Sequence, residues 1–385
     1  MQARDASSSS SNVERPNVAG DCTQAASGTQ SDSAPVRPQS LTALLLADSK
    51  PGHYHQSEGV IAAIGRMRPV TTLRREIRRR FFLPTRTLLQ LVNRGASAAA
   101  ILRLGYGIDP SSLPTADVVV SAGGETLAAN AAAAKLLGAA NIFCGRLRRL
   151  APEHVKLVIV SLQQFAELPN HLVCLPPSPI DVELPPATGK PRGVRFGRTK
   201  PPARVGVLIG GNSGAYRYRR QDWLQLIAFL RAVHRAHGVR WLAATSRRSG
   251  RFIGDALASM AKTGEGGLET FIDFRTAGAG TLAHIFAAAD AILCTDDSTT
   301  MISEAIGARL PVVSVGPAAS ALEAREAEYR QFLAREGWYR SLALSRLAPE
   351  AFLAALDEIT PRTSSQLDEL AAAMSRRLPE LFARP

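Results

Sequence analysis

The chain has 385 residues, which is long enough for two domains of ordinary size. Its residues are 45% hydrophobic and 21% charged, a composition typical of a soluble globular protein. No apolar run approaches the roughly 20 residues that span a bilayer, so no membrane-spanning helix is expected. The formal net charge of +13 favours phosphorylated ligands or an acidic lipid surface, whereas nucleic acid is disfavoured as a partner because no binding motif for it is recognisable.

Residues 1–38 are too polar to pack and are predicted to form a disordered tail. The tail has no apolar core resembling a signal peptide, and acids such as Asp5 and Glu14 argue against a transit peptide. The cysteines are scattered without metal-binding spacing, which is typical of a reducing compartment. We therefore expect a cytoplasmic protein. The cysteines are Cys22, Cys144, Cys174 and Cys294.

Residues 39–185 are predicted to form a first α/β domain, in which buried strands alternate with helices and so favour a parallel sheet. Its first strand runs directly into a turn that contains proline and glycine, followed by a helix. Strands are expected at 41–47, 116–122, 141–144, 157–160 and 171–175, and helices at 56–67 and 125–137.

The stretch 66–103 contains ten arginines and a single acidic residue, Glu76, interleaved with apolar residues such as Phe81 and Phe82. A basic and apolar stretch of this kind suits a peripheral contact with an anionic membrane. The alternative is an ordinary solvated helix with Phe81 and Phe82 in the core.

The proline-rich stretch 186–203 suits neither a helix nor a central strand and is predicted to be an interdomain linker. A second α/β domain is expected over 204–345, and residues 346–385 are predicted to be helical. In the second domain, strands are expected at 205–209, 240–245, 271–274, 291–295 and 311–315, and helices at 223–237, 251–261, 282–289 and 300–308.

A glycine turn follows the first strand of the second domain, over residues 210–214. Glycines at a strand-to-helix turn let backbone N–H groups converge on a phosphate, and Asn212 and Ser213 add donors. The alternative is a tight structural turn. The predicted phosphate residues are Gly210, Gly211, Asn212, Ser213 and Gly214.

A second anion site is predicted where the strand 291–295 delivers Ser298, Thr299 and Thr300 to the start of a helix. Glu304 lies in that helix and could accept hydrogen bonds from both hydroxyls of a ribose, or be a solvated or capping residue. The neighbouring Asp296 and Asp297 could suggest a metal, but adjacent side chains point in different directions, so no metal site is expected.

Five motifs together resemble the "elongated mitochondria" family, a bacterial and plant group described as mitochondrial-fission factors or glycosyltransferases. They are Asp48-x-Lys-Pro-Gly-His53-x-x-Gln-Ser57, Ser-Ala-Gly at 121–123, Ile-Gly-Gly at 209–211, Thr-Ser-Arg-Arg at 245–248 and Asp-Ser-x-x-Met-x-Ser-Glu at 297–304. The second domain more distantly resembles the lipid-intermediate N-acetylglucosaminyltransferases. Departures from the family pattern include Ser49 in place of Gly, His55 in place of Asn, and Gly-Thr-Leu in place of Asn-Pro-Tyr at 280–282.

The resemblance implies a GT-B-like fold: two Rossmann-type, doubly wound parallel-sheet domains that face a central cleft. It implies that the glycine turn and helix start hold the nucleoside diphosphate of a donor sugar, and that Glu304 holds its ribose. The implied reaction is inverting transfer of the sugar to a lipid-linked or envelope acceptor at the inner membrane surface. The nucleotide-sugar is then a substrate, and no cofactor is expected.

Such a transfer needs a general base, and His53 could take that role with Asp48 orienting it. Alternatively, His53 caps the helix or binds substrate, and Asp48 caps the turn. Lys50, or Arg247 with Arg248, could stabilise the departing diphosphate. On the acceptor side, Gly52, Gly123 and Gly124 are predicted to allow a close approach of the backbone.

Two other functions remain open. A nucleotide-sugar epimerase shares this architecture, but it would act without a membrane surface and would require an acidic pair that the sequence does not clearly offer. A non-catalytic, nucleotide-binding membrane adaptor would retain the diphosphate site and could lose His53 without effect.

Overall fold

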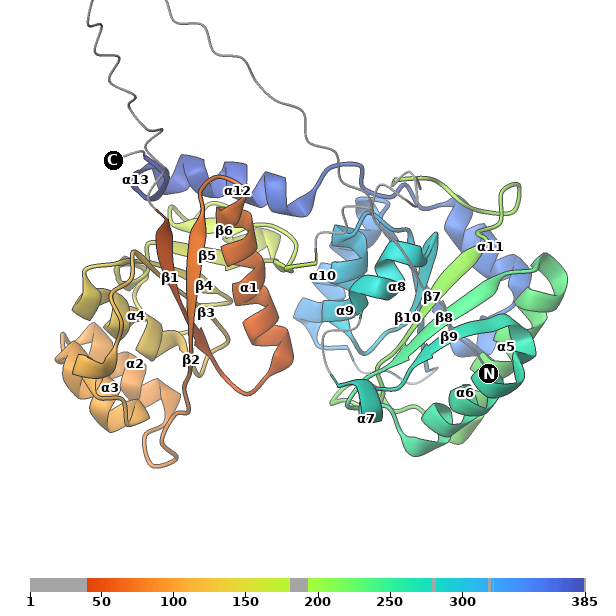
Figure 1. The fold of residues 1–385 in the computed structure, drawn as a ribbon, viewed down its shortest axis with the longest axis horizontal. Helices are drawn as coiled ribbons and strands as arrows, with labels where there is room; N and C mark the ends of the chain where they lie inside the picture. Colours follow the sequence, from red (N-terminus) through yellow and green to blue (C-terminus); the bar gives the residue numbers. More distant parts are fainter. Residues whose placement is uncertain (1–39, 181–192, 279–281, 318–319, 321, 384–385) are drawn as a thin grey trace, which may run out of the picture. The chain divides into compact units, whose positions relative to one another are not determined.

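The computed structural model describes residues 40–180, 193–278, 282–317, 320 and 322–383 (Figure 1). The predicted tail at 1–38, Cys22, the first part of the predicted linker and the family departure at Gly280 lie outside these residues.

The first sheet has six parallel strands in the order β2-β1-β3-β4-β5-β6. The first strand, β1, lies next to the edge strand β2, and the direction of strand addition reverses between β1 and β3. Its strands are β1 (Leu41–Ala47), β2 (Val70–Glu76), β3 (Val118–Ala122), β4 (Ala140–Cys144), β5 (Leu157–Val160) and β6 (His171–Val173), and its helices are α1 (Pro51–Gly65), α2 (Thr85–Asn93), α3 (Ala98–Tyr106) and α4 (Leu127–Leu137).

Alternate residues of β1 enter two separate cores, as expected for a strand with both faces covered. Leu44 and Leu46 pack with α2, α3 and α4 on one face. Leu41 and Leu45 pack on the other face with α1 and with α12 (Gln366–Arg377). This face of the first sheet is therefore covered by helices from opposite ends of the sequence, as Figure 1 shows.

The second sheet also has six parallel strands, in the order β12-β11-β10-β7-β8-β9. Here the reversal lies between β7 and β10. The strands are β7 (Arg204–Ile209), β8 (Arg240–Thr245), β9 (Leu268–Ile272), β10 (Ala291–Thr295), β11 (Val312–Gly316) and β12 (Tyr339–Ala343), and the helices are α5 (Arg220–His237), α6 (Arg251–Thr263), α7 (Phe274–Ala277), α8 (Leu282–Ala288), α9 (Thr299–Gly307), α10 (Ala324–Arg335) and α11 (Pro349–Asp357). The short α13 (Pro379–Phe382) follows α12.

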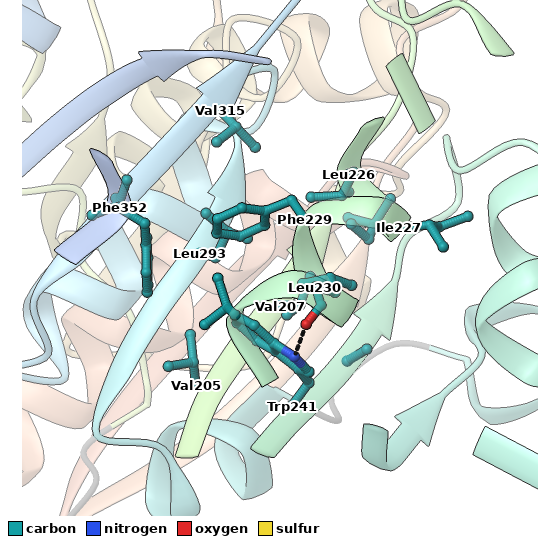
Figure 2. Packing of buried hydrophobic residues seen from close by; sticks show 14 of the residues in the cluster. Val205, Val207, Leu226, Ile227, Phe229, Leu230, Trp241, Leu293, Val315 and Phe352 are labelled. Atoms are coloured by element: carbon teal, nitrogen blue, oxygen red, sulfur yellow. Dashed lines mark hydrogen bonds between the residues drawn. The ribbon is translucent and has the colours of Figure 1, made fainter. Parts of the chain in front are cut away.

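The core of the second sheet is built from aromatic and branched aliphatic side chains (Figure 2). On one face, α5, α6 and α11 cover Val205 and Val207. The only side-chain donor of the buried Trp241 is satisfied by a hydrogen bond of 3.0 Å from Nε1 to the carbonyl oxygen of Leu230, and Phe352 of α11 packs against the indole. On the other face, α8, α9 and α10 pack against β7 and β10, which fixes the helix that carries the predicted ribose carboxylate.

The predicted fold class is confirmed: two doubly wound parallel sheets, flanked by helices, form a GT-B-like fold. Most elements were predicted within a few residues, and the strands at 157–160, 240–245 and 291–295 have the expected bounds. Two strands were not expected, β2 and β12, and both lie at the edge of a sheet. Within the described ranges, no helix combines the length and the apolar character needed to cross a bilayer.

Candidate functional site

The predicted site residues follow strands that lie on either side of the reversal in each sheet. In the first sheet, Asp48 and His53 follow β1, and Gly123 follows β3, its neighbour. In the second sheet, the glycine turn follows β7 and the segment 296–300 follows the neighbouring β10. The carboxyl ends of the strands at such a switch point are the usual ligand-binding position in open α/β sheets. Sheet topology thus brings each group together from distant parts of the sequence.

Asp48 and His53 form a hydrogen-bonded pair at the switch point of the first sheet. Asp48 is buried, with a side chain that is 2% exposed, and its Oδ2 lies 2.6 Å from His53 Nδ1. Its Oδ1 accepts the backbone N–H of Lys50 at 3.0 Å, which fixes the turn before α1. The carboxylate therefore holds both the turn and the imidazole, and the His53 side chain remains 31% exposed.

Gly123 and Gly124 provide the space that two side chains occupy. Gly123 has φ +84°, and a Cβ there would lie 2.1 Å from His53 Nδ1, so only glycine fits beside the imidazole. A Cβ on Gly124 would lie 2.5 Å from the guanidinium carbon of Arg148. The side chains that approach these glycines are thus His53 and Arg148, and the predicted approach of an acceptor stays a prediction.

The glycine turn of the second sheet is packed against Asp297 and Arg248. The N–H of Gly210 donates to Thr295 Oγ1 at 2.7 Å, and the N–H of Gly211 donates to Asp297 Oδ2 at 2.9 Å. Arg248 Nη2 donates to the same carboxylate oxygen at 2.6 Å. Three of the sequence motifs, at 209–211, 245–248 and 297–304, therefore meet at one point.

The remainder of the glycine turn is held by its own contacts. Asn212 Oδ1 accepts the backbone N–H of Tyr218 at 2.7 Å, and Ser213 forms a pair of backbone hydrogen bonds with Tyr216. A Cβ on Gly214 would meet no atom within 4 Å. Arg247 is exposed next to Arg248.

The start of α9 is fixed by a capping hydroxyl and by a buried arginine. Ser298 accepts the backbone N–H of Met301, which caps the helix. Thr299 Oγ1 donates to Glu326 Oε1 at 2.6 Å and accepts from Arg330 Nη2 at 3.2 Å, so its hydroxyl is held by α10. Thr300 is partly buried, with its Oγ1 3.4 Å from where a Cβ on Gly52 would lie.

Glu304 is buried on α9, with a side chain that is 5% exposed, and it lies 3.8 Å from the imidazole of His55 on α1. The Glu304 carboxylate raises the pKa of His55 above its ordinary value, against the opposing effect of burial. The predicted ribose carboxylate therefore faces a histidine in this structure. Its role toward a ribose, like the roles of the other site residues, remains a prediction.

Sequence reasoning did not assign a role in the site to His55, Asp297 or Arg330. In the sequence, His55 stands out only as a departure from the family pattern. Adjacent aspartates were expected to point apart, and they do: Asp296 accepts hydrogen bonds from Ser314 and Tyr339, whereas Asp297 faces the glycine turn. A buried arginine one helix away from the site leaves no signal in the local sequence pattern.

Comparison with known proteins gives one family and a set of structural neighbours. The sequence model of the family described as mitochondrial fission ELM1 matches residues 51–378. No curated protein matches the chain in sequence. MurG of Acinetobacter baumannii is 13% identical, with 87% of this chain and 99% of that one covered and a TM-score of 0.44. The glycosyltransferase SnogD of Streptomyces nogalater is 14% identical, with 89% and 96% covered and a TM-score of 0.45.

A UDP-GlcNAc 2-epimerase of Methanocaldococcus jannaschii is 11% identical, with 88% of this chain and 100% of that chain covered and a TM-score of 0.50. At this identity, the likeness shows a shared fold and nothing finer.

Proposed function

The chain belongs to the mitochondrial fission ELM1 family, and we propose that it is an inverting glycosyltransferase. It would move a sugar from a nucleoside-diphosphate donor to a lipid-linked or cell-envelope acceptor at the inner membrane surface. The observation that carries this proposal is the placement of Asp48 and His53 at the switch point of one sheet, and of the glycine turn and the start of α9 at that of the other.

The base would be His53, because its hydrogen bond to Asp48 fixes the tautomer that is needed. A carboxylate oxygen only accepts, so Nδ1 of His53 carries the proton and donates it to Asp48 Oδ2. Nε2 then holds a lone pair and can take the proton of an acceptor hydroxyl. As that hydroxyl oxygen bonds to the anomeric carbon, the bond from carbon to the phosphate oxygen breaks, and the diphosphate leaves with the electron pair.

The donor would be held by the second sheet. Glu304 is a buried carboxylate that can accept hydrogen bonds from ribose hydroxyls. The first-turn amides of α9 carry the partial positive charge of a helix N-terminus and suit a diphosphate. Lys50 and Arg247 are exposed cations that could assist when the leaving group departs.

A membrane contact would be made by the loop after β2, here called the Arg-Phe loop and defined as residues 78–84. Phe81 is 91% exposed and Phe82 is 55% exposed, so the alternative in which both lie in the core is wrong. Arg78 and Arg80 are exposed around them, and the backbone N–H of Arg80 donates to the carbonyl oxygen of Gly105, which holds the loop against α3. Exposed aromatic side chains next to exposed arginines are typical of a segment that binds the interface of an anionic bilayer.

The test is calorimetric titration of the full chain with UDP, ADP, GDP and CMP. We expect one nucleotide to bind, and Glu304→Ala to weaken that binding by about 1–3 kcal/mol through the lost ribose hydrogen bonds. Glu350→Ala, an exposed acid of α11, is the matched control. Equal affinity in Glu304→Ala would refute the ribose role.

The same titration separates the alternatives. Failure of all four nucleotides to bind would contradict both the enzyme and the nucleotide-binding adaptor, whereas nucleotide binding without any turnover would favour the adaptor. If a nucleotide binds, the corresponding nucleotide-sugar is then incubated with the protein and membranes. Formation of an epimer of the free nucleotide-sugar, without transfer, would favour the epimerase.

A further inference from the structure

Asp297 is the residue on which the glycine turn is built. Its side chain is 0% exposed, and its carboxylate accepts from the N–H of Gly211 and from Arg248. A Cβ on Gly210 would lie 2.1 Å from Asp297 Oδ2, and a Cβ on Gly211 would lie 2.1 Å from the carbonyl oxygen of Arg248. Both glycines are therefore required by the approach of Asp297 and Arg248.

The backbone donors of these two glycines are already satisfied inside the protein. The N–H of Gly210 is taken by Thr295, and that of Gly211 is taken by Asp297. A diphosphate would have to displace the Thr295 hydroxyl to reach the first N–H and the buried Asp297 carboxylate to reach the second. At Gly211, two anions would then compete for the same amide. The glycine turn therefore does not offer these two amides to a phosphate.

Arg248 is the group that the turn presents instead. Its Nη2 is fixed by the carboxylate of Asp297 and also lies 3.4 Å from the Asp297 carbonyl oxygen, while the side chain as a whole is 38% exposed. A guanidinium has five N–H donors, so anchoring one nitrogen leaves others for an external anion. Anchoring also removes conformational freedom that a free arginine would lose on binding.

We propose that Asp297 is a positioning residue that fixes Arg248 as the cation facing the diphosphate of the donor. The inference rests on the proposed function. Arg248 has two effects here: it donates to the diphosphate, and it neutralises the buried charge of Asp297, which would otherwise repel the ligand. Asp297 itself touches no substrate and acts only through Arg248 and the turn.

The experiment is a double-mutant cycle on binding, with UDP, ADP and GDP each paired with its nucleoside as probes. For the pair that the wild type binds, Arg248→Gln is expected to weaken the diphosphate roughly 10- to 100-fold and to leave the nucleoside unchanged. Asp297→Asn is expected to weaken the diphosphate roughly 3- to 10-fold, since Arg248 loses its anchor. The double variant is expected to bind better than Arg248→Gln alone, because no unpaired carboxylate remains.

Two further variants serve as checks on specificity and folding. Arg235→Gln removes an exposed arginine of α5 and is the matched control, which should bind like the wild type. Arg248→Lys keeps the charge without the fork and should retain part of the affinity, which keeps the test valid if Asp297→Asn fails to fold.

The outcomes are distinct. Wild-type binding with equal diphosphate affinity in Arg248→Gln would overturn this inference and leave the proposed function standing. Equal losses for diphosphate and nucleoside would also overturn it, because they indicate a structural role. If the wild type binds no nucleotide at all, the proposed function and this inference both fail.

Discussion

His53 and Asp48 are the side chains whose replacement tests the proposed chemistry most directly. Turnover in His53→Gln is expected to fall by a factor of about 10²–10⁴, the usual contribution of a general base, while nucleotide affinity is unchanged. Asp48→Asn should also lower turnover, since an amide can donate to Nδ1 and stabilise the wrong tautomer. The measurements are steady-state transfer rates and calorimetric affinities for the same variants.

The matched control for this pair is His154→Gln, since that partly buried histidine directly precedes β5 and so lies toward the amino ends of the parallel strands, opposite the carboxyl ends where Asp48 and His53 lie. Full turnover in His53→Gln would remove His53 as the base.

His55 gives a pH dependence to stability. Its folded pKa is raised by Glu304, so its protonated form is stabilised in the folded protein. This contribution is fully present below the unfolded value of about 6.5 and is lost as the pH rises through the folded pKa above it. Replacing His55 by Gln should therefore lower the free energy of unfolding more at about pH 5.5 than at about pH 8.5.

Urea unfolding of the wild type and His55→Gln at both pH values measures this difference. An equal loss at the two pH values would show that the contact with Glu304 carries no charge-dependent stabilisation.

At the scale of elements, the loop between β10 and α9 is ordered by a buried arginine. Arg330 has a side chain that is 8% exposed, and its Nη2 donates to the carbonyl oxygen of Asp296 at 2.8 Å and to Glu326 at 3.1 Å. Its Nη1 donates to Tyr339 Oη at 3.3 Å. Arg330 of α10 therefore connects its own helix to β12 and to the loop after β10. The position of α9 relative to the sheet depends on this network.

Arg330→Met should therefore cost about 3–5 kcal/mol of stability, the usual result of removing one partner from a buried charge network. The exposed Arg335 on the same helix is the matched control, and Arg335→Met should change stability by less than about 0.5 kcal/mol. Thermal and urea unfolding of the wild type and both variants measure the free energy of unfolding. An equal loss of stability in the two variants would contradict the role of the network.

The elements also show which signals the sequence carries. Strands such as Leu157–Val160 and Ala291–Thr295 are uninterrupted apolar runs, because both of their faces are buried. Val70–Glu76 and Tyr339–Ala343 lie at sheet edges, where polar and charged residues are tolerated, and they were missed for that reason. The helix α1 begins at Pro51, earlier than expected, since proline suits the first turn of a helix.

The site also contains contacts that the sequence predicts and contacts that it does not. Asp48 and His53 are five residues apart, so local spacing was enough to predict their contact, whereas their joint role in catalysis stays a prediction. The contact of Gly211 with Asp297 joins residues 86 positions apart. It exists only because β7 and β10 are neighbours, and strand order is not readable from either segment alone.

At the scale of the whole molecule, the proposed membrane contact can be measured by sedimentation with vesicles of anionic and neutral phospholipids. The full chain should bind the anionic vesicles more strongly, and binding should weaken with salt. Phe81→Ser should reduce binding by removing an apolar group that is 91% exposed in the protein, and hence without loss of stability.

Leu136→Ser, which removes a partly exposed apolar residue of α4, is the matched control for that experiment. Equal binding of neutral and anionic vesicles, or of wild type and Phe81→Ser, would rule out the Arg-Phe loop as the contact.

The return of α12 to the first sheet has a consequence for synthesis. Leu370 and Met374 complete a core whose other members include Leu41 and Leu45. During synthesis, more than three hundred residues separate β1 from α12, the helix that covers this face of the sheet. The first half of the protein is thus translated with an open apolar surface. Docking of α12 on the first sheet is therefore expected to be a late step of folding, after the second sheet has been synthesised.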